Sequence, residues 1–369
     1  MRNSTVFIIF WDLDIGGIQT LIKDLILYIL KNRPDLTVEV LIKNTKDSHI
    51  INVLKASGFS NIHSPKIESI KNRYIRQLYF LIWIAFFYLK KNPIYCLTFL
   101  DTLSIYMILL KQCFFWKKTK IILNENILTS KNTQIYKTNI YFWNMCIKLL
   151  YPLSYLVIVP SEACKKDLIK TYNIAKSKIR VLYNWTLMEE VKRKTRKYDL
   201  IYLGRFEKEK NPTSLIYLTL MLKRKFPNIT LRLVGKGSYQ MKMEAIINKY
   251  NLSKNITFDG FRGDVDILLS DAKILVTTTQ NEGIPLSMLE AGIQKTPCVS
   301  TVFEGVEEVI LHNKTGYISN SLSEMALYIT KLLRDPNLRN KFGLHAHKRI
   351  LEKFSANAID TFLSEIMPI

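Results

Sequence analysis

The 369-residue sequence lacks the patterns that indicate a metal centre, a disulfide framework or a transmembrane helix. Its five cysteines are an odd number and none stands in a C-x-x-C pair, which argues against structural zinc and disulfides and fits a reducing compartment. No apolar run reaches the roughly 20 residues that span a bilayer. The first apolar run, residues 6–10, is too short for a secretion signal. We therefore expect a cytoplasmic protein whose chain opens with a buried strand.

Acidic residues are scarce relative to basic ones. The chain has 53 Lys and Arg against 31 Asp and Glu, a formal net charge of +22. Residues 55–180 hold 20 basic and 5 acidic residues, whereas residues 1–54 hold 6 of each. Such an excess suits nucleic acid or an anionic membrane. Because the sequence has no RNP, helix-turn-helix or zinc-finger pattern, we expect no nucleic-acid partner.

The basic stretch also contains an aromatic run, YFLIWIAFFYL at residues 79–89, which Lys90 and Lys91 follow. Two interpretations are open. The run is a buried core helix that ends in a solvated basic turn, or it belongs to a surface that lies on anionic lipid and binds a lipid-linked substrate. The second interpretation predicts a protein that is peripheral on the inner face of the cell membrane.

Short apolar runs alternate with helical patterns along the whole chain, which predicts parallel sheets covered by helices. Nearly half of the residues are hydrophobic, enough for two cores. We expect an α/β fold of two doubly wound, Rossmann-like domains that face a central cleft: residues 1–188, residues 189–350, and a C-terminal helix at 351–369 that returns to the first domain. The polar run at 189–197 is the expected linker. The predicted strands are 6–10, 38–42, 94–99, 121–123, 156–159, 200–203, 229–234, 256–258, 274–278, 298–301 and 315–318.

Three glycine-containing turns follow predicted strands and are candidate phosphate sites. Gly16 and Gly17 precede a helix whose first N–H groups are free, although a tight turn needs such glycines as well. Arg205 and Lys210 stand between a strand and a helix, where two cations suit a diphosphate or form a solvated charged loop. Gly235 lies in a G-x-G turn, which alone is weak evidence.

Two carboxylates are the other candidate. Glu282 falls in the loop after the strand at 274–278, and Glu290 falls on the helix that begins at Pro285. Spaced carboxylates can hold the paired hydroxyls of a sugar and a ribose. The same pair could serve glycoside hydrolysis, and Glu290 taken alone could face solvent.

With these sites in this order, the chain resembles the retaining glycosyltransferases of the GT-B fold, specifically glycosyltransferase family 4. The resemblance is most specific between residues 200 and 318. It rests on GR at 204–205 with Lys210, on EGIP at 282–285 with Glu290, and on TG at 315–316. In the first half it is thinner and rests on Gly16-Gly17, on VPSE at 159–162 and on VLYN at 181–184.

The resemblance implies a role for each site. Arg205, Lys210 and the Gly17 amide would bind the donor diphosphate, and Glu290 the ribose. Glu282 would hold the donor sugar beside the backbone of four residues: Gly283, Ile284, Pro285 and Leu286. Gly235 and Phe261 would border the nucleobase. The family needs no metal, which agrees with the lack of an Asp-x-Asp loop in the second domain; Asp12 and Asp14 have that spacing in the first.

One departure concerns the histidine that many members place after the fourth strand of the first domain. None of the five histidines falls there. The corresponding stretch is NEN at 124–126, and we assign Glu125 and Asn126 to the active site in its place.

The sequence thus predicts a metal-independent, retaining hexosyltransferase without cofactor. It would move a hexose or N-acetylhexosamine from a nucleotide sugar, a UDP-sugar favoured, to a growing surface polysaccharide such as capsule or O-antigen. The acceptor would be linked to polyprenyl diphosphate. Two alternatives stay open: a basic nucleic-acid- or lipid-binding protein without catalysis, and another GT-B enzyme such as a sugar-nucleotide epimerase.

Overall fold

The computed structural model describes residues 4–13, 16–44, 48–67, 69–136, 139–192 and 195–367. The chain divides into two compact units, Met1–Leu182 with Ile359–Ile369, and Tyr183–Ala358. Each is a parallel sheet with helices on both faces, so the expected α/β class with two Rossmann-like units is confirmed. The first boundary falls before the expected residue 188.

The first unit holds a seven-stranded sheet in the order β3-β2-β1-β4-β5-β6-β7, parallel throughout. Its central strands are buried from end to end, as the continuous apolar runs indicate. The two edge strands β3 and β7 were not predicted, because two or three residues are too few to show a periodicity. The strands are β1 (Ser4–Ile9), β2 (Leu36–Leu41), β3 (Ile62–His63), β4 (Tyr95–Phe99), β5 (Lys120–Asn124), β6 (Leu156–Val159) and β7 (Ile179–Val181).

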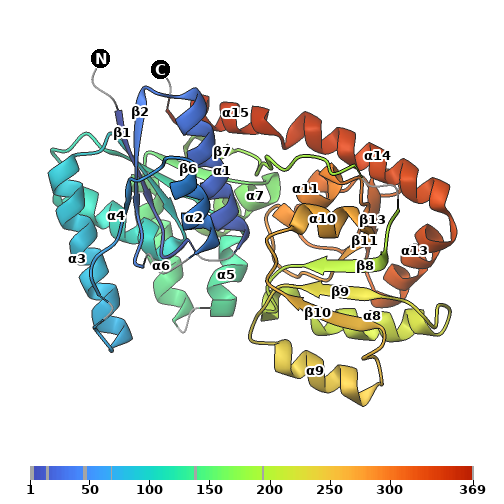
Figure 1. Ribbon diagram of the computed structural model, residues 1–369. Coiled ribbons are helices and arrows are strands. Elements are labelled where there is room, and N and C mark those ends of the chain that lie inside the picture. Colours follow the sequence, from blue (N-terminus) through green and yellow to red (C-terminus); the bar gives the residue numbers. More distant parts are fainter. Residues whose placement is uncertain are drawn as a thin grey trace. The chain divides into compact units, whose positions relative to one another are not determined.

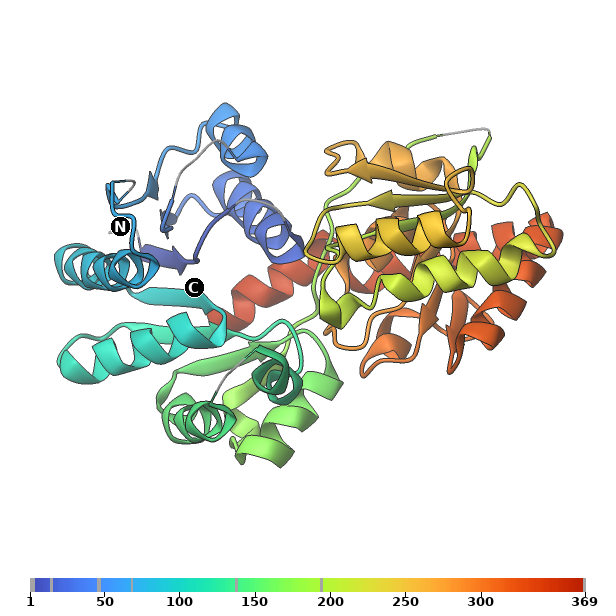
Figure 2. The same ribbon diagram turned by 90° about the horizontal axis from the view of Figure 1, so that it is seen from below.

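Helices cover both faces of this sheet (Figures 1 and 2). One face packs against α3 (Arg73–Lys91), α4 (Asp101–Cys113), α6 (Ile140–Leu150) and α7 (Glu162–Tyr172), which share a core cluster with β1, β4, β5 and β6. The opposite face carries α1 (Gly17–Asn32) and α2 (His49–Ala56). The remaining elements of this half are α5 (Thr129–Tyr136), η1 (Tyr151–Leu153) and η2 (Lys176–Lys178).

The C-terminal helix α15 (Ala356–Ile366) reaches the first unit through two polar contacts. Tyr28 on α1 donates to the Asp360 carboxylate at 2.6 Å, and Arg180 lies 3.5 Å from Glu365. The return begins at Ile359 and not at residue 351, because α14 (Pro336–Lys353) still belongs to the second unit.

The second unit holds a six-stranded parallel sheet in the order β10-β9-β8-β11-β12-β13. Helices α8, α9 and α13 contact one another on one face, and α10, α11 and α14 cover the other (Figure 1). The strands are β8 (Tyr198–Leu203), β9 (Leu231–Val234), β10 (Ile256–Gly260), β11 (Ala272–Thr277), β12 (Cys298–Thr301) and β13 (Gly316–Ser319). The helices are η3 (Lys208–Lys210), α8 (Thr213–Lys223), α9 (Gln240–Lys249), α10 (Val265–Ser270), α11 (Leu286–Ile293), α12 (Val306–Val309) and α13 (Leu322–Arg334).

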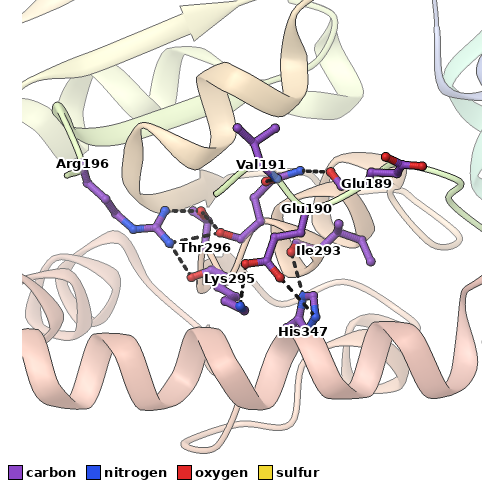
Figure 3. Close-up of polar contacts among 9 residues, drawn as sticks. Glu189, Glu190, Val191, Arg196, Ile293, Lys295, Thr296 and His347 are labelled. Atoms are coloured by element: carbon purple, nitrogen blue, oxygen red, sulfur yellow. Dashed lines mark hydrogen bonds and ion pairs between the residues drawn. The ribbon is translucent and has the colours of Figure 1, made fainter. Parts of the chain in front are cut away.

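The polar run expected as a free linker is instead attached to the second unit (Figure 3). The Gln294 side chain accepts from the Val191 backbone at 2.9 Å and donates to the Glu189 carbonyl at 2.7 Å. Glu190 pairs with Lys295 at 2.5 Å. Residues 193–194 of the run lie outside the described residues. The run has the composition of a linker, but these polar groups have partners that are distant in sequence.

Arg196 makes the densest of these contacts. Its guanidinium donates to the Lys295 carbonyl at 2.8 Å, to the Gln294 carbonyl at 3.1 Å and to the Thr296 hydroxyl at 2.5 Å. It also reaches the carbonyl oxygens of three residues around the start of β11: Leu269, Ser270 and Ala272. Burial, and secondarily Arg339, lower its pKa to about 10, so it stays charged at neutral pH.

Replacing Arg196 with Ala should destabilise the protein by about 2–3 kcal/mol, because several carbonyl oxygens lose a charged donor. For a unit of this size, the melting temperature should fall by roughly 4–10 °C. Arg224→Ala is the control, since Arg224 is exposed at the end of α8. Equal melting temperatures for the two variants would show that the Arg196 contacts add nothing.

Candidate active site

The predicted cations lie at the carboxyl end of β8. Arg205 follows the strand directly, and Lys210 ends the short helix η3 before α8 begins. Arg205 is exposed, and its guanidinium contacts the Glu209 carboxylate at 3.0 Å. Glu209 itself is buried. The carboxylate therefore orients the guanidinium while leaving most of it open to a ligand.

The predicted carboxylate Glu282 lies at the carboxyl end of the neighbouring strand. β8 and β11 are adjacent and parallel, so the loops that follow them leave the same edge of the sheet. Glu282 forms an ion pair with Lys210 there. The structure thus brings together two residues that the sequence placed in separate motifs.

Polar contacts tie these two loops together. The Thr278 hydroxyl donates to the carbonyls of Lys210 and Asn211 at 3.1 and 2.9 Å. The Gln280 N–H donates to the Glu209 carbonyl at 2.8 Å. The position of Lys210 is therefore set by the loop that carries Glu282.

The surroundings of Lys210 disfavour its charged form. Burial, and secondarily the nearby Arg205 guanidinium, lower its pKa to about 7, against the opposing effect of Glu209. A further anion bound beside Lys210 would oppose this lowering of its pKa. Lys210 is thus a cation whose charge depends on what occupies the site.

The loop from Gly283 to Pro285 is buried and leads into α11. Asn184 donates to the Ile284 carbonyl at 2.8 Å and holds the loop from the start of the second unit. Glu290 lies in the second turn of α11, the position that the sequence predicts, and its side chain is half-buried. The first N–H groups of α11, from Leu286 on, open at the same edge.

Gly235 and Phe261 follow β9 and β10, so they share this edge with the β8 and β11 loops. Gly235 has φ 138°, and a Cβ atom on it would lie 2.0 Å from the Gly204 carbonyl oxygen. It is therefore needed for the close approach of the two turns. Phe261 is exposed beyond β10.

The sites predicted in the first half lie in the first unit. Gly17 is the first residue of α1, and the Gly16 carbonyl accepts from Thr20 N at 3.1 Å. Asp12 and Asn44 form an isolated parallel β-bridge. Asp14 lies outside the described residues. Among the described residues, no group of three or more His, Cys, Asp and Glu side chains is arranged as a metal site.

Glu125 and Asn126 follow β5, as predicted, but the Glu125 carboxylate is buried. It accepts from the Tyr151 hydroxyl at 2.5 Å and from Thr129 at 3.5 Å. Asn126 is half-buried and lies 3.5 Å from the Asn124 carbonyl. The structure shows Glu125 as a partner of Tyr151 inside the unit, and its catalytic role stays a prediction.

Three residues of the site were missed in the sequence: Asn184, Glu209 and Thr278. Each acts by holding another residue of the site or its loop, and no local pattern marks such a function. Asn184 was noticed only as part of the VLYN stretch, and Glu209 only as a charge in a solvated loop.

The part of the chain that carries these loops is similar to a known protein family. The model of the family "Glycosyl transferases group 1" matches residues 184–349, which include the cations, both carboxylates and Asn184. Residues 184–349 are thus similar to a glycosyltransferase group 1 domain, and the match covers less than half of the chain.

Two curated relatives show the same likeness. A poly(ribitol-phosphate) alpha-N-acetylglucosaminyltransferase of Staphylococcus aureus is 28% identical over 207 residues, 55% of this chain and 42% of that protein. An N-acetylgalactosaminyltransferase of Campylobacter jejuni acting on a diphospho-undecaprenol glycan is 23% identical over 64% of this chain and 66% of that protein. The first match spans less than half the length of its protein.

Solved structures extend the likeness of the fold over the whole chain. TarM of S. aureus, in a mutant form crystallised with Fondaparinux, alpha-GlcNAc-glycerol and UDP, superimposes with a TM-score of 0.83 at 16% identity, over 99% of this chain and 100% of that chain. HepE of Anabaena, with UDP and glucose, gives a TM-score of 0.79 at 15% identity over 98% of each chain. The two α/β units therefore have the architecture of GT-B glycosyltransferases such as TarM.

The packing at Gly235 predicts a specific sensitivity. Gly235→Ala should destabilise the protein by about 2–4 kcal/mol, because the new methyl group meets a backbone oxygen that cannot move freely. Gly260→Ala is the matched control: its φ is +65°, but a Cβ atom there meets only the end of a Lys236 side chain at 3.7 Å. It should cost only the roughly 1–2 kcal/mol of the left-handed backbone. Thermal denaturation that gives both variants the same melting temperature would contradict the packing argument.

Proposed function

We propose that this protein is a metal-independent, retaining glycosyltransferase of family 4. It would transfer a hexose or N-acetylhexosamine from a nucleotide sugar, a UDP-sugar favoured, to a growing surface polysaccharide such as capsule or O-antigen. The observation that carries the proposal is the set formed by Arg205, Lys210 and Glu282 at one sheet edge, within a glycosyltransferase group 1 domain.

The donor diphosphate is the ligand that this edge suits. Arg205 offers a fork of donors and Lys210 a point charge, so together they can neutralise a departing diphosphate. We propose that they replace a metal ion in this task. Donors that are fixed before the reaction are often the largest single contribution to catalysis. The Glu209 carboxylate and the Thr278 hydroxyl fix these two here.

The donor sugar and the ribose need hydroxyl acceptors. We propose that Glu282 accepts from the sugar, beside the backbone of the loop that Asn184 holds, and that Glu290 accepts from the ribose. In the free protein Glu282 pairs with Lys210. A bound diphosphate would take over Lys210 and release Glu282 for the sugar. Retention would follow if the leaving phosphate oxygen takes the acceptor proton on the same face of the sugar.

The proposed acceptor rests mainly on similarity to other proteins. Names of relatives mention poly(ribitol-phosphate) and a diphospho-undecaprenol glycan. We propose a glycan linked to polyprenyl diphosphate, used at the inner face of the cell membrane. Among the described residues, no helix is both long and apolar enough to span a bilayer.

Removing either cation should abolish most of the activity. We expect Arg205→Ala and Lys210→Ala to lower donor turnover by roughly 10²–10³-fold, the usual cost of losing a preorganised electrostatic contact. Lys208→Ala is the control, because Lys208 is an exposed cation on the same short helix. The assay is release of UDP from UDP-sugars, chosen beforehand by thermal shift against GDP- and ADP-sugars. Turnover near that of the wild type in either site variant would contradict the assignment of that cation to the donor diphosphate.

Donor binding should take up a proton. The pKa of Lys210 is about 7 in the free protein, and a neighbouring diphosphate would raise it. The complex then holds more protons than the free protein above pH 7, so the affinity should fall as pH rises, by up to about tenfold per pH unit. Calorimetric titration with a UDP-sugar, whose diphosphate diester does not titrate there, measures the slope. Lys210→Met should bind more weakly with a flat profile, and a flat profile in the wild type would refute the linkage.

A further inference from the structure

Helices α3, α4 and α6 form one layer on the first unit. The Tyr106 hydroxyl of α4 donates to the Leu81 carbonyl of α3, and α4 packs against α6. All three helices contribute to the same core cluster. The inner face of each helix therefore packs in this core, and its outer face points away from the sheet.

The outer face of α3 is apolar as well. A helix on the surface of a soluble protein normally has a polar outer face. On α3, the core face consists of Phe80, Ile84 and Tyr88. The exposed side chains include Tyr74, Ile75, Leu78, Ile82, Phe86 and Leu89. The aromatic run is therefore a core helix that also presents an apolar surface.

Helix α6 and the segment after α4 in the same layer also expose apolar side chains. Tyr141 is 90% exposed at the start of α6, and Phe142, Met145 and Leu149 follow on the exposed side of that helix. After α4, Phe115 and Trp116 are 74% and 62% exposed. Figure 1 shows α3 and α6 extending past the edge of the first sheet at which β1 ends. We call this exposed apolar surface of α3, α6 and the end of α4 the aromatic face.

The charge around the aromatic face is of one sign. Residues 69–155 contain 12 Lys and Arg and two acidic residues, Asp101 and Glu125. Both acidic side chains are buried. Arg73, Lys90, Lys91, Lys118 and Lys148 are exposed. A second copy of this chain would bring like charges together, whereas an anionic lipid surface offers both hydrocarbon and opposite charge.

We propose that the aromatic face lies on an anionic bilayer, with its aromatic side chains in the headgroup region and its lysines and arginines on lipid phosphates. The inference deepens the proposed function and rests on it for the lipid-linked acceptor. The exposed aromatic rings suit the membrane interface, where an apolar body and a polar tip are both satisfied. Contact there would place the first unit against the membrane, where a lipid-linked acceptor would lie.

Vesicle flotation of the full-length protein tests this, with no donor or acceptor present. The wild type should float with vesicles of phosphatidylcholine and phosphatidylglycerol, far less with phosphatidylcholine alone, and less at high salt. The double variant Ile82→Glu with Phe86→Glu should lose more than about tenfold in partition, since each buried apolar side chain is worth about 1.5–3 kcal/mol. Leu327→Glu on α13, with the same exposure of about 60%, is the matched control and should float like the wild type.

Three results would overturn the proposal. The first is a wild type that never floats with anionic vesicles. The second is a double variant that floats as well as Leu327→Glu. The third is a wild type that sediments as a dimer and a double variant that is monomeric, with neither binding vesicles, which would identify a second copy as the partner. Melting temperatures equal to that of the wild type confirm that the variants fold. UDP-sugar binding, measured separately, shows whether the proposed donor site is intact in a protein that does not bind vesicles.

Discussion

The pairing of Lys210 with Glu282 depends on one constraint, the parallel adjacency of β8 and β11. Parallel neighbours end at the same edge, so the loops after them meet although long stretches of chain separate them. Thr278 and Gln280 then join the two loops through the backbone around Lys210. The same edge receives Gly235 from β9 and Phe261 from β10. If β8 and β11 were not neighbours, Lys210 and Glu282, two of the three groups of the proposed donor site, would lie apart.

Burial gives that pair its chemical character. A lysine on the surface is charged whatever its surroundings, but Lys210 lies beside Arg205 with little water, so its pKa is lowered. The Glu282 carboxylate is its ion-pair partner in the free protein. A lysine whose pKa is lowered in this way gains charge when a further anion binds beside it, whereas a solvated lysine is already charged. Arg205 is more exposed than Lys210, and the buried Glu209 carboxylate orients its guanidinium.

Two segments show where local sequence reasoning was insufficient. The run at 189–197 has the composition of a linker, yet Glu189, Val191 and Arg196 are attached to the loop before β12. The run at 79–89 has the composition of a core helix or of a lipid surface, and α3 is a core helix whose outer face is also apolar. In each case composition describes the side chains themselves, whereas the outcome depends on which groups from distant parts of the chain lie opposite them.

The sequence by itself determined the alternation of strands and helices and the two-unit α/β class. It also determined the positions of the cations and Glu282 on their loops and of Glu290 on its helix. It did so because period, glycine turns and strand-to-loop boundaries are local properties. Tertiary structure alone decided that Lys210 meets Glu282, that Asn184 holds the Ile284 carbonyl and that Glu209 orients Arg205. It also decided that the Glu125 carboxylate is buried against Tyr151. Apart from the Arg205–Glu209 pair, which lies within one loop, these contacts join residues from different strands and turns. Strand order and burial, which no short pattern encodes, bring them within hydrogen-bonding distance.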